Sequence, residues 1–362
     1  MKGQRYIWIE RRLYPSLRME VLAAILSILL ALLAIGVLFG VVGVDPLFVY
    51  RRIFMGAFGS LFGLSETIVK AIPLMLVGVG LTLAFRARMW NIGAEGQLLM
   101  GAIAATGVAL TFPDLPAGVL LPAMFVAGFV GGALWGLIPA LLKVYFRANE
   151  VLTSLMLVYV ASEAVNYLVY GPWRGPEEMG FPLTSKFSPA AQLPRLLNTR
   201  IHYLTLLLAL LLAVLVYLLV RRTRLGYEIR VTGENPTAAR YAGMDYTKIV
   251  LLVMLLSGGL AGLAGVGEVA GIHHRMHYPA GISPGYGFTA IIVAWLARLN
   301  PLAAILTAFL LGGLLVGGHS IQIALGLPVA TIHIFNGVIL LFVLGGELFT
   351  RYQIRLKRRP EP

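Results

Sequence analysis

Long apolar runs limit most strongly what this chain can fold into. Residues 21–44 form one such run, and a helix needs about 20 residues to cross the hydrocarbon core of a bilayer. Ten segments of this kind can be drawn: 20–43, 67–85, 97–112, 117–141, 150–170, 203–220, 248–270, 286–298, 302–318 and 329–349. Lipid offers no partner for a bare backbone N–H, so each should be helical. The sequence therefore predicts an all-α polytopic membrane protein with about ten transmembrane helices.

Composition excludes two other classes of protein. Hydrophobic residues make up 59% of the 362 residues and charged residues 12%, whereas soluble domains average about 45–50% and about 25%. A soluble enzyme and a disordered chain are therefore excluded. The net charge of +13 comes from short clusters between apolar runs, which indicates membrane topology and contact with lipid rather than nucleic-acid binding. The chain has no cysteine, so disulfides and thiolate metal sites are excluded too.

The distribution of Lys and Arg predicts the orientation. If the N-terminus is cytoplasmic and ten spans alternate, 21 of the 29 cations lie inside and eight outside, Lys70 among the eight. This bias favours cytoplasmic termini. We therefore predict one membrane domain over 1–362. It comprises a cytoplasmic segment at 1–18, a membrane region at 19–350 with an inner loop at 221–247, and a basic cytoplasmic tail at 351–362.

Two further patterns concern organisation. Five prolines between 171 and 202 predict an ordered outer loop or lid, and residues 45–66 are typical of an interfacial helix. Residues 67–170 and 248–349 also resemble an inverted repeat, because a polar glycine-containing break at 91–97 corresponds to one at 281–287. Inverted repeats with broken helices are typical of transporters. The alternative is that glycine and proline are simply common in membrane helices.

Polar residues beside these apolar runs are the candidate pathway residues. Asn91, Glu95 and Gln97 lie within seven residues, and an ionisable group at membrane depth normally faces a pore or a partner. A plain cytoplasmic turn is the alternative. Asn149 and Glu150 open the fifth span, where they line the pathway or only cap the helix. Glu163 and Asn166 lie on one face of that span and could line a pathway or join neighbouring helices.

The eighth span is preceded by glycines, aromatics and, upstream, histidines. Tyr286 and Phe288 could stack on a planar ligand or anchor the membrane interface. The spacing of His273, His274 and His277 could hold zinc, but a solvated loop is favoured. Glycines at 256–270 are interpreted as a close helix-packing face. No pattern supports catalysis, so we expect an enzyme activity, a metal and a cofactor to be absent from this chain.

The inner loop at 221–248 contains a short helix signal. The stretch from Gly233 to Pro236 ends one element, Asn235 can cap the next, and Pro236 suits its first position. The new helix should run from Thr237 to Ala242 and stop at Gly243. A short capped helix between two spans suggests a surface for a soluble partner. The alternative is a solvated loop whose six cations only set topology.

Four motifs together resemble the inner-membrane permeases of ABC importers for ribose-type sugars, branched-chain amino acids and nucleosides. They are NIGAEGQLLMGA (91–102), NEVLTSLML (149–157), RLGYEIRVTGENPTAARYAGM (224–244) and GYGFTAIIVAWLARLNP (285–301). The first and last are most similar to nucleoside-type permeases. The rival classes are an ion-coupled secondary transporter using Glu95, Glu163 and Glu268, and a non-transporting scaffold. The outer loop at 271–280 departs from the family pattern.

The resemblance implies a multi-pass permease of the cytoplasmic membrane for ATP-driven nucleoside import, with simple sugars as the alternative substrate. It implies a second permease, often non-identical, ABC ATPase subunits that carry ATP and Mg, and an extracytoplasmic substrate-binding lipoprotein. The pathway would use Asn91, Glu95, Gln97, Asn149, Glu150, Tyr286 and Phe288. ATPase coupling would use Gly233, Glu234, Asn235, Pro236, Ala239, Arg240 and Tyr241.

Overall fold

The computed structural model describes residues 5–11, 17–41, 43–177, 180–326 and 352–358, with scattered positions between 330 and 346. Contacts divide the chain into two compact units, which are described separately. One comprises 1–52 with 319–362, and the other comprises 53–318. The prediction of a single membrane domain over 1–362 stays a prediction.

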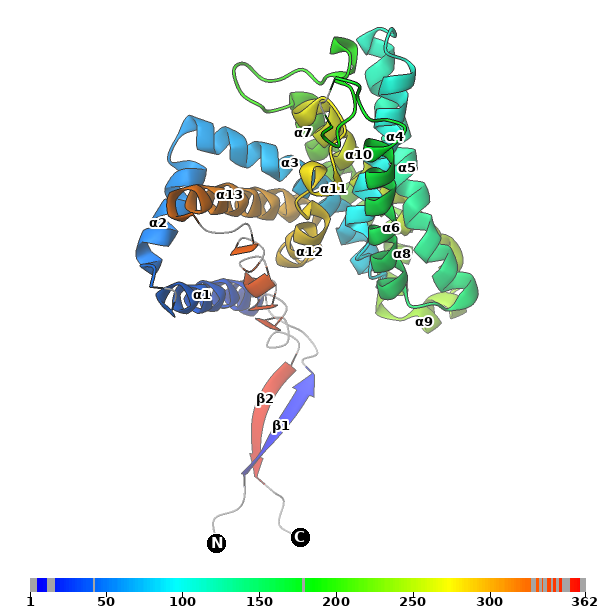
Figure 1. Ribbon diagram of the computed structural model, residues 1–362. Helices are drawn as coiled ribbons and strands as arrows, with labels where there is room; N and C mark the ends of the chain where they lie inside the picture. The colour runs from blue at the N-terminus through cyan, green and yellow to red at the C-terminus, as the bar shows by residue number, and fades with distance from the viewer. Residues whose placement is uncertain are drawn as a thin grey trace. The chain divides into compact units, whose positions relative to one another are not determined.

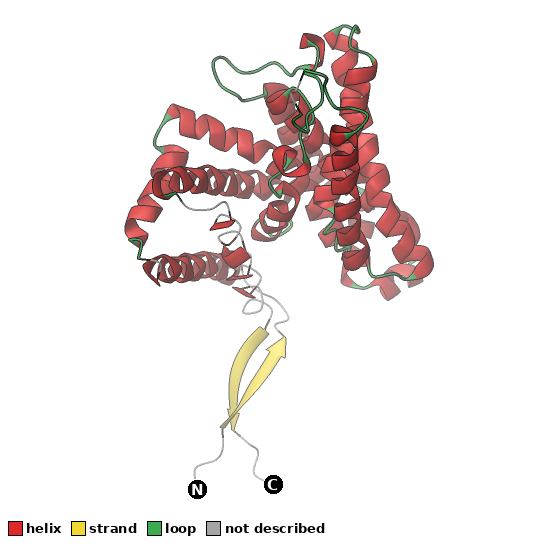
Figure 2. Cartoon of the chain, in the orientation of Figure 1, coloured by secondary structure: helices red, strands yellow, loops and turns green. Residues whose placement is uncertain are grey.

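The first unit contains helix α1 (Leu17–Val41) and two short strands, β1 (Arg5–Arg11) and β2 (Tyr352–Arg358). The strands pair antiparallel, with Arg5 opposite Arg358 and Arg11 opposite Tyr352, as Figure 2 shows in yellow. The all-α prediction did not include this pair. Residues 5–11 and 352–358, which lie within the predicted cytoplasmic N-terminal segment and basic tail, are hydrogen-bonded to each other along their backbones. The cytoplasmic location of both segments stays a prediction. Helix α2 (Pro46–Phe58) falls within the predicted interfacial segment.

The second unit is helical (Figure 1). Its longer helices are α3 (Leu61–Arg86), α4 (Ala94–Thr111), α5 (Ala117–Phe146), α6 (Glu150–Tyr170), α7 (Tyr203–Arg222), α10 (Tyr246–Val266) and α13 (Pro301–Leu325). Helix α13 continues past residue 318 into the first unit. Its shorter helices are α8 (Arg224–Glu234), α9 (Pro236–Tyr241), α11 (Pro279–Ile282) and α12 (Tyr286–Leu296). A 3-10 turn, η1, covers Pro189–Ala191, and a π-helical stretch, η2 (Gly267–His273), continues α10.

Within the described residues, six helices are long and apolar enough to cross a membrane, or seven if α1 and α2 form one bent span. Nine of the ten predicted segments coincide with helices, whereas most of the tenth, 329–349, lies outside the described residues. Helices α4 and α12, at the third and eighth predicted segments, are not among the six. Ten crossings and cytoplasmic termini therefore stay predictions.

Close glycine contacts hold the centre of this unit together. Helices α4, α5 and α10 pack on one another, and their glycines face each other at the crossings. A Cβ built on Gly262 would lie 2.1 Å from the Gly128 carbonyl oxygen, and one on Gly258 would lie 2.5 Å from the Gly132 oxygen. Only the absence of side chains lets the backbones approach this closely. The predicted packing face at 256–270 is confirmed.

Burial separates central helices from peripheral ones. The most apolar window of α3 is 89% buried and that of the span 246–273 is 78% buried, whereas that of α6 is 22% buried. Polar side chains such as Thr82 on α3 and Ser257 and Glu268 on the span 246–273 therefore lie in the interior of the unit, whereas Glu163 of α6 is exposed.

Candidate functional site

Two breaks in the helical backbone meet in the interior of the second unit. The Oε2 atom of Glu95, in the first turn of α4, accepts a hydrogen bond of 2.6 Å from the Gly287 N–H at the start of α12. Ser283 and Gly285 lie close to the same carboxylate. A carboxylate at a helix N-terminus satisfies N–H groups that have no partner within the helix. The breaks that the sequence matched at 91–97 and 281–287 are thus in direct contact.

Glycine is required at this meeting point. A Cβ on Gly287 would lie 2.3 Å from the Glu95 backbone nitrogen and 2.5 Å from its Cα. Both atoms belong to backbone and cannot rotate away. Position 287 therefore lets the first turn of α12 rest directly on the first turn of α4.

The amides of Asn91 and Gln97 bond each other. Each side-chain nitrogen donates to the oxygen of the other at 2.9 Å, and Asn91 also donates to the Ser257 hydroxyl on α10 at 3.1 Å. Their exposed fractions are 0% and 1%. Both polar groups are thereby satisfied inside the protein, so in this conformation the pair holds the 87–93 break against α10. A contact with substrate stays a prediction for these two residues.

Tyr286 bonds a lysine that the sequence placed elsewhere. Its hydroxyl accepts a hydrogen bond of 2.7 Å from Lys70 of α3, and its ring is 1% exposed. The ring is therefore closed to a stacking ligand in this conformation. Phe288 is 40% exposed and, two residues further along α12, points away from Tyr286. The sequence counted Lys70 only among the outer cations, whereas the structure places it within α3 and bonds it to Tyr286. A lone lysine within an apolar run was the available signal, and the side of the membrane on which it lies stays a prediction.

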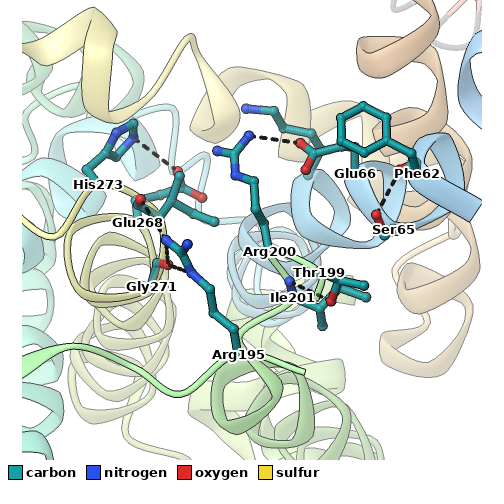
Figure 3. Close-up of polar contacts among 12 residues, drawn as sticks. Phe62, Ser65, Glu66, Arg195, Thr199, Arg200, Ile201, Glu268, Gly271 and His273 are labelled. Carbon is teal, nitrogen blue, oxygen red and sulfur yellow. Dashed lines mark hydrogen bonds and ion pairs between the residues drawn. The ribbon is translucent and has the colours of Figure 1, made fainter. Parts of the chain in front are cut away.

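Carboxylates and cations gather around this lysine. Glu268 of η2 is 2% exposed, and Lys70 and Arg200 supply positive charge near it. Arg200 donates to Glu66 of α3 at 3.1 Å, as Figure 3 shows. We call Glu66, Lys70, Glu95, Arg200 and Glu268 the charged cluster. Charged groups among membrane helices face partners or a water-filled path. The sequence identified Glu95, and Glu268 as a carboxylate of the rival ion-coupled transporter, but not the cluster as a whole.

The loop at 171–202, which the sequence predicts to lie outside, is fastened to the segment that follows α10. Thr184 and Met276 exchange two hydrogen bonds, of 3.1 and 2.9 Å. The Phe187 N–H donates to the His274 carbonyl at 2.8 Å, and the Leu193 N–H donates to the carbonyl of residue 270 at 2.9 Å. The prediction of an ordered loop is confirmed for its described residues, and its outer location stays a prediction.

Arg195 of this loop caps the end of η2. Its guanidinium donates to the Gly271 carbonyl at 3.1 Å, as Figure 3 shows. It also donates to the Ile272 carbonyl at 3.2 Å and contacts His274 Nε2 at 2.6 Å. His274 Nδ1 lies 2.9 Å from the Ala270 carbonyl oxygen. A carbonyl requires a donor and a guanidinium an acceptor, so the imidazole is neutral with its proton on Nδ1. Burial, and then Arg195, lower the pKa of His274 accordingly.

The three histidines are not a solvated loop, so that expectation is wrong. His273 is 22% exposed, its Nε2 lies 3.7 Å from Glu268 Oε2, and its ring centroid is 4.6 Å from that of His277. Loop 171–202 covers the segment, which local composition could not reveal. Among the described residues no group of three or more His, Cys, Asp or Glu side chains converges on a metal position.

A fourth histidine, His202, was missed by the sequence. Its side chain is fully buried, and within the described structure neither ring nitrogen has a hydrogen-bond partner. The ring packs on the backbone of η2, because a Cβ on Gly271 would lie 2.7 Å from it and one on Gly267 would lie 3.4 Å from it. Burial, and then Arg195 and Arg200, lower the pKa of His202 to about 4.

Asn149 and Glu150 take structural positions at the turn between α5 and α6. The Asn149 side chain caps α6 by accepting from the N–H groups of residues 151 and 152 at 2.9 and 3.3 Å. Glu150 pairs with Lys143 at 2.7 Å. The structure thus satisfies both groups locally and does not bring them to the charged cluster.

The predicted short helix of the inner loop is confirmed as α9. Asn235 Oδ1 accepts from the N–H groups of Thr237 and Ala238 at 3.0 and 3.1 Å, and Pro236 occupies the first helical position. Gly243, where the helix was expected to stop, has a φ of +76°, and such a left-handed residue terminates helices.

The segment α8–α9 is anchored on one side and open on the other. Gly233 lies against the end of α3, because a Cβ there would be 1.9 Å from the Arg86 carbonyl oxygen. Ala239 is fully buried, and the Arg240 guanidinium lies 5.1 Å from the Tyr246 ring centroid on α10. The exposed predicted coupling residues are Glu234, Asn235, Arg240 and Tyr241. Tyr241 is 90% exposed, which is the greatest exposure among the large hydrophobic side chains of this segment.

The chain was compared with known protein families and with individual proteins. Residues 63–344 match the model of the family described as branched-chain amino acid transport system / permease component. A glucose ABC transporter permease protein, TsgB13 of Haloferax volcanii, is 41% identical over 91% of this chain and 88% of that protein. The guanosine ABC transporter permease protein NupP of Bacillus subtilis is 34% identical over 94% of this chain and 97% of that protein. The nucleoside ABC transporter permease protein NupB of Lactococcus lactis is 28% identical over 90% of each chain.

Proposed function

Because this chain belongs to the permease family of branched-chain amino acid transport systems, and is an ABC transporter permease of the cytoplasmic membrane, we propose that it forms part of an ATP-driven import path for nucleosides. The observation that carries the proposal is the α8–α9 segment. This segment ends in the short capped helix α9, which has an exposed face. The segment is anchored to the central helices α3 and α10. An ATPase that grips this face would act on both central helices at once.

The anchoring provides a route from α9 to the charged cluster. Gly233 contacts Arg86, which is the last residue of α3. Lys70 lies 16 residues earlier in the same helix, about 24 Å away along the helix axis. Helix α10 leads directly into η2 and Glu268. A displacement of α9 on ATP binding would thus reach the cluster through two rigid helices. Work would come from the difference in ATP affinity between the two conformations.

The charged cluster is the proposed gate. Glu95 joins the N-termini of α4 and α12, and Lys70 joins α3 to α12. Breaking these contacts would free the two helix breaks to move apart and open a path. In this proposal Asn91 and Gln97 hold the break between α3 and α4 in place, and Tyr286 becomes accessible only when Lys70 releases it.

The substrate assignment follows the guanosine and nucleoside relatives, which are 34% and 28% identical to this chain. A second candidate is a simple sugar, favoured by the glucose permease at 41% identity. Both candidates are small neutral rings with several hydroxyl groups. Among the same relatives, permeases occur under paired names, NupP with NupQ and TsgB13 with TsgC13. We therefore propose a non-identical second permease, ABC ATPase subunits carrying ATP and Mg, and an extracytoplasmic binding lipoprotein as partners.

Uptake into vesicles tests the proposal. The chain would be co-expressed with the permease, ATPase and binding protein encoded beside it, and the purified complex would be reconstituted into proteoliposomes. We expect ATP-dependent accumulation of labelled guanosine. Accumulation of labelled glucose but not guanosine would favour the second candidate. Transport by the chain alone, driven by an ion gradient without an ATPase, would refute the proposal and favour a secondary transporter.

A further inference from the structure

Helix α6 presents two unlike faces. Its buried stripe is formed by Ser154, Val158, Ala161, Val165 and Val169, which repeat every three or four residues, and the helix packs against α4, α5 and α11. The opposite stripe is exposed. Glu163 lies at its centre, with Tyr159 one turn before it and Tyr167 one turn after it.

The position of Glu163 along α6 makes lipid an unsuitable environment for it. Glu163 lies 13 residues after Glu150 and seven before Tyr170, so it is about 20 Å from one end of the helix axis and about 10 Å from the other. The hydrocarbon core is about 30 Å thick. A carboxylate at this depth normally faces a protein partner or a water-filled path.

Apart from the exposed Val160, the residues one turn before and after Glu163 on this face are polar or aromatic as well. Asn166 donates a hydrogen bond of 3.3 Å to Glu163 Oε2. Tyr159, Tyr167 and Tyr170 are 62%, 72% and 60% exposed. The stripe therefore combines one carboxylate, one amide and three aromatic rings over about three helical turns.

This combination fits a hydroxyl-bearing ring. The two oxygens of a carboxylate can accept hydrogen bonds from two neighbouring hydroxyl groups, and an amide can both donate and accept. Aromatic rings supply apolar area for the C–H face of a sugar or for a base. Sites for small molecules typically place a few such polar groups among aromatic side chains.

We propose that the exposed stripe of α6 lines the import path, and that Glu163, oriented by Asn166, binds two adjacent hydroxyl groups of the substrate ring. The inference rests on the proposed function and narrows it. The recognised feature is a pair of neighbouring hydroxyls, as in the ribose of a nucleoside or in a pyranose. Substrates that lack one of the two hydroxyls should be transported less well.

Pairs of substrates that differ by one hydroxyl test the proposal. The reconstituted complex would be assayed with guanosine against 2′-deoxyguanosine and with glucose against 2-deoxyglucose. The wild-type complex should prefer the full diol by about tenfold or more in uptake efficiency, since a hydrogen bond to a charged group is lost with the hydroxyl. Glu163→Gln should reduce this preference to about twofold, because the amide retains only one acceptor oxygen. Asn166→Ala should give an intermediate preference.

A matched control makes the same chemical change elsewhere. Glu177 is exposed on the outer loop, and Glu177→Gln should leave the preference unchanged. An unchanged preference in Glu163→Gln, with wild-type uptake intact, would overturn the inference and leave the proposed function standing. Loss of the second permease from purified Glu163→Gln complex would also overturn it, by showing that the stripe is a protein interface. If the wild-type complex transports neither guanosine nor glucose with ATP, the proposed function is refuted, and the inference that rests on it is refuted with it.

Discussion

Replacing Gly262 by alanine tests whether backbone contact between α5 and α10 holds the membrane core together. The added Cβ would lie 2.1 Å from the Gly128 carbonyl oxygen, 3.0 Å from its carbonyl carbon and 3.1 Å from the Gly132 Cα. All three atoms belong to the backbone of α5, so no side chain can rotate to make room. The nearest contact falls 1.3 Å short of the 3.4 Å at which ordinary contact begins.

The cost follows from separating two packed helices. Between membrane helices, van der Waals packing stabilises the association, because lipid tails are as apolar as the side chains. A gap of 0.5–1 Å already removes about a quarter to a half of each contact energy. Overpacking of a dense core costs about 1–3 kcal/mol, and the extra helix propensity of alanine returns at most about 1 kcal/mol. We expect Gly262→Ala to destabilise the fold by about 1–3 kcal/mol.

Unfolding of the purified chain by SDS, followed through tryptophan fluorescence, measures this difference. Gly118→Ala is the matched control, because it lies in α5 and has nothing within 4 Å of its built Cβ. That variant should be neutral or more stable by about 0.4–1 kcal/mol, since alanine restricts the unfolded chain. If both variants unfold at the same SDS concentration, the close glycine crossing contributes no stability and the reasoning fails.

Three further predictions concern the site. Glu95→Ala should lower ATP-dependent uptake at least tenfold while the complex still assembles, because the N–H groups at the start of α12 lose a buried acceptor worth about 1–3 kcal/mol; normal uptake would remove Glu95 from the path. The double variant Asn235→Ala with Arg240→Ala should lose co-purification of the ATPase, since the cap of α9 is worth about 1 kcal/mol, and intact assembly would contradict the coupling role. Burial lowers the pKa of His202 to about 4 in the fold, so the unfolded chain binds the proton first. Stability should therefore fall as pH drops from about 6.5 to about 4, by up to roughly 3 kcal/mol, and His202→Leu should show a flatter unfolding profile over that range; identical profiles would refute this.

Features with local causes could be predicted from the sequence. The cap, first residue and stop of α9 depend on side chains within a few residues of one another, so Asn235, Pro236 and Gly243 were sufficient to predict them. The apolar length of a span likewise depends on its own residues, which is why nine segments coincide with helices. The glycine face of α10 was predictable because close helix packing requires small residues whatever the partner.

Features that join distant segments could not be predicted. Lys70 and Tyr286 are 216 positions apart, and Glu95 and Gly287 are 192 apart. No periodic pattern specifies such pairs, although the correspondence of the two helix breaks indicated that they were related. Asn91 and Gln97 illustrate the other limit, since their residue types suit a ligand site but tertiary structure pairs them with each other. The histidines were assigned to solvent because nothing near them shows that residues 184–195 cover them.

The π-helical geometry of Gly267–His273 has a consequence for how this segment tolerates changes in length. A π-helical turn accommodates one more residue than an α-helical turn, since its N–H groups bond five residues back. Deleting one residue here would let the backbone relax into a regular α-helix, at little cost in hydrogen bonds. Because the deleted residue is the extra one of the π-helical turn, the segment beyond it would keep nearly the same direction. Met276 would still face Thr184, and Arg195 would still reach the carbonyls at the end of the segment. The same deletion within the α-helical part of α10 would rotate everything downstream by about 100° and detach this loop.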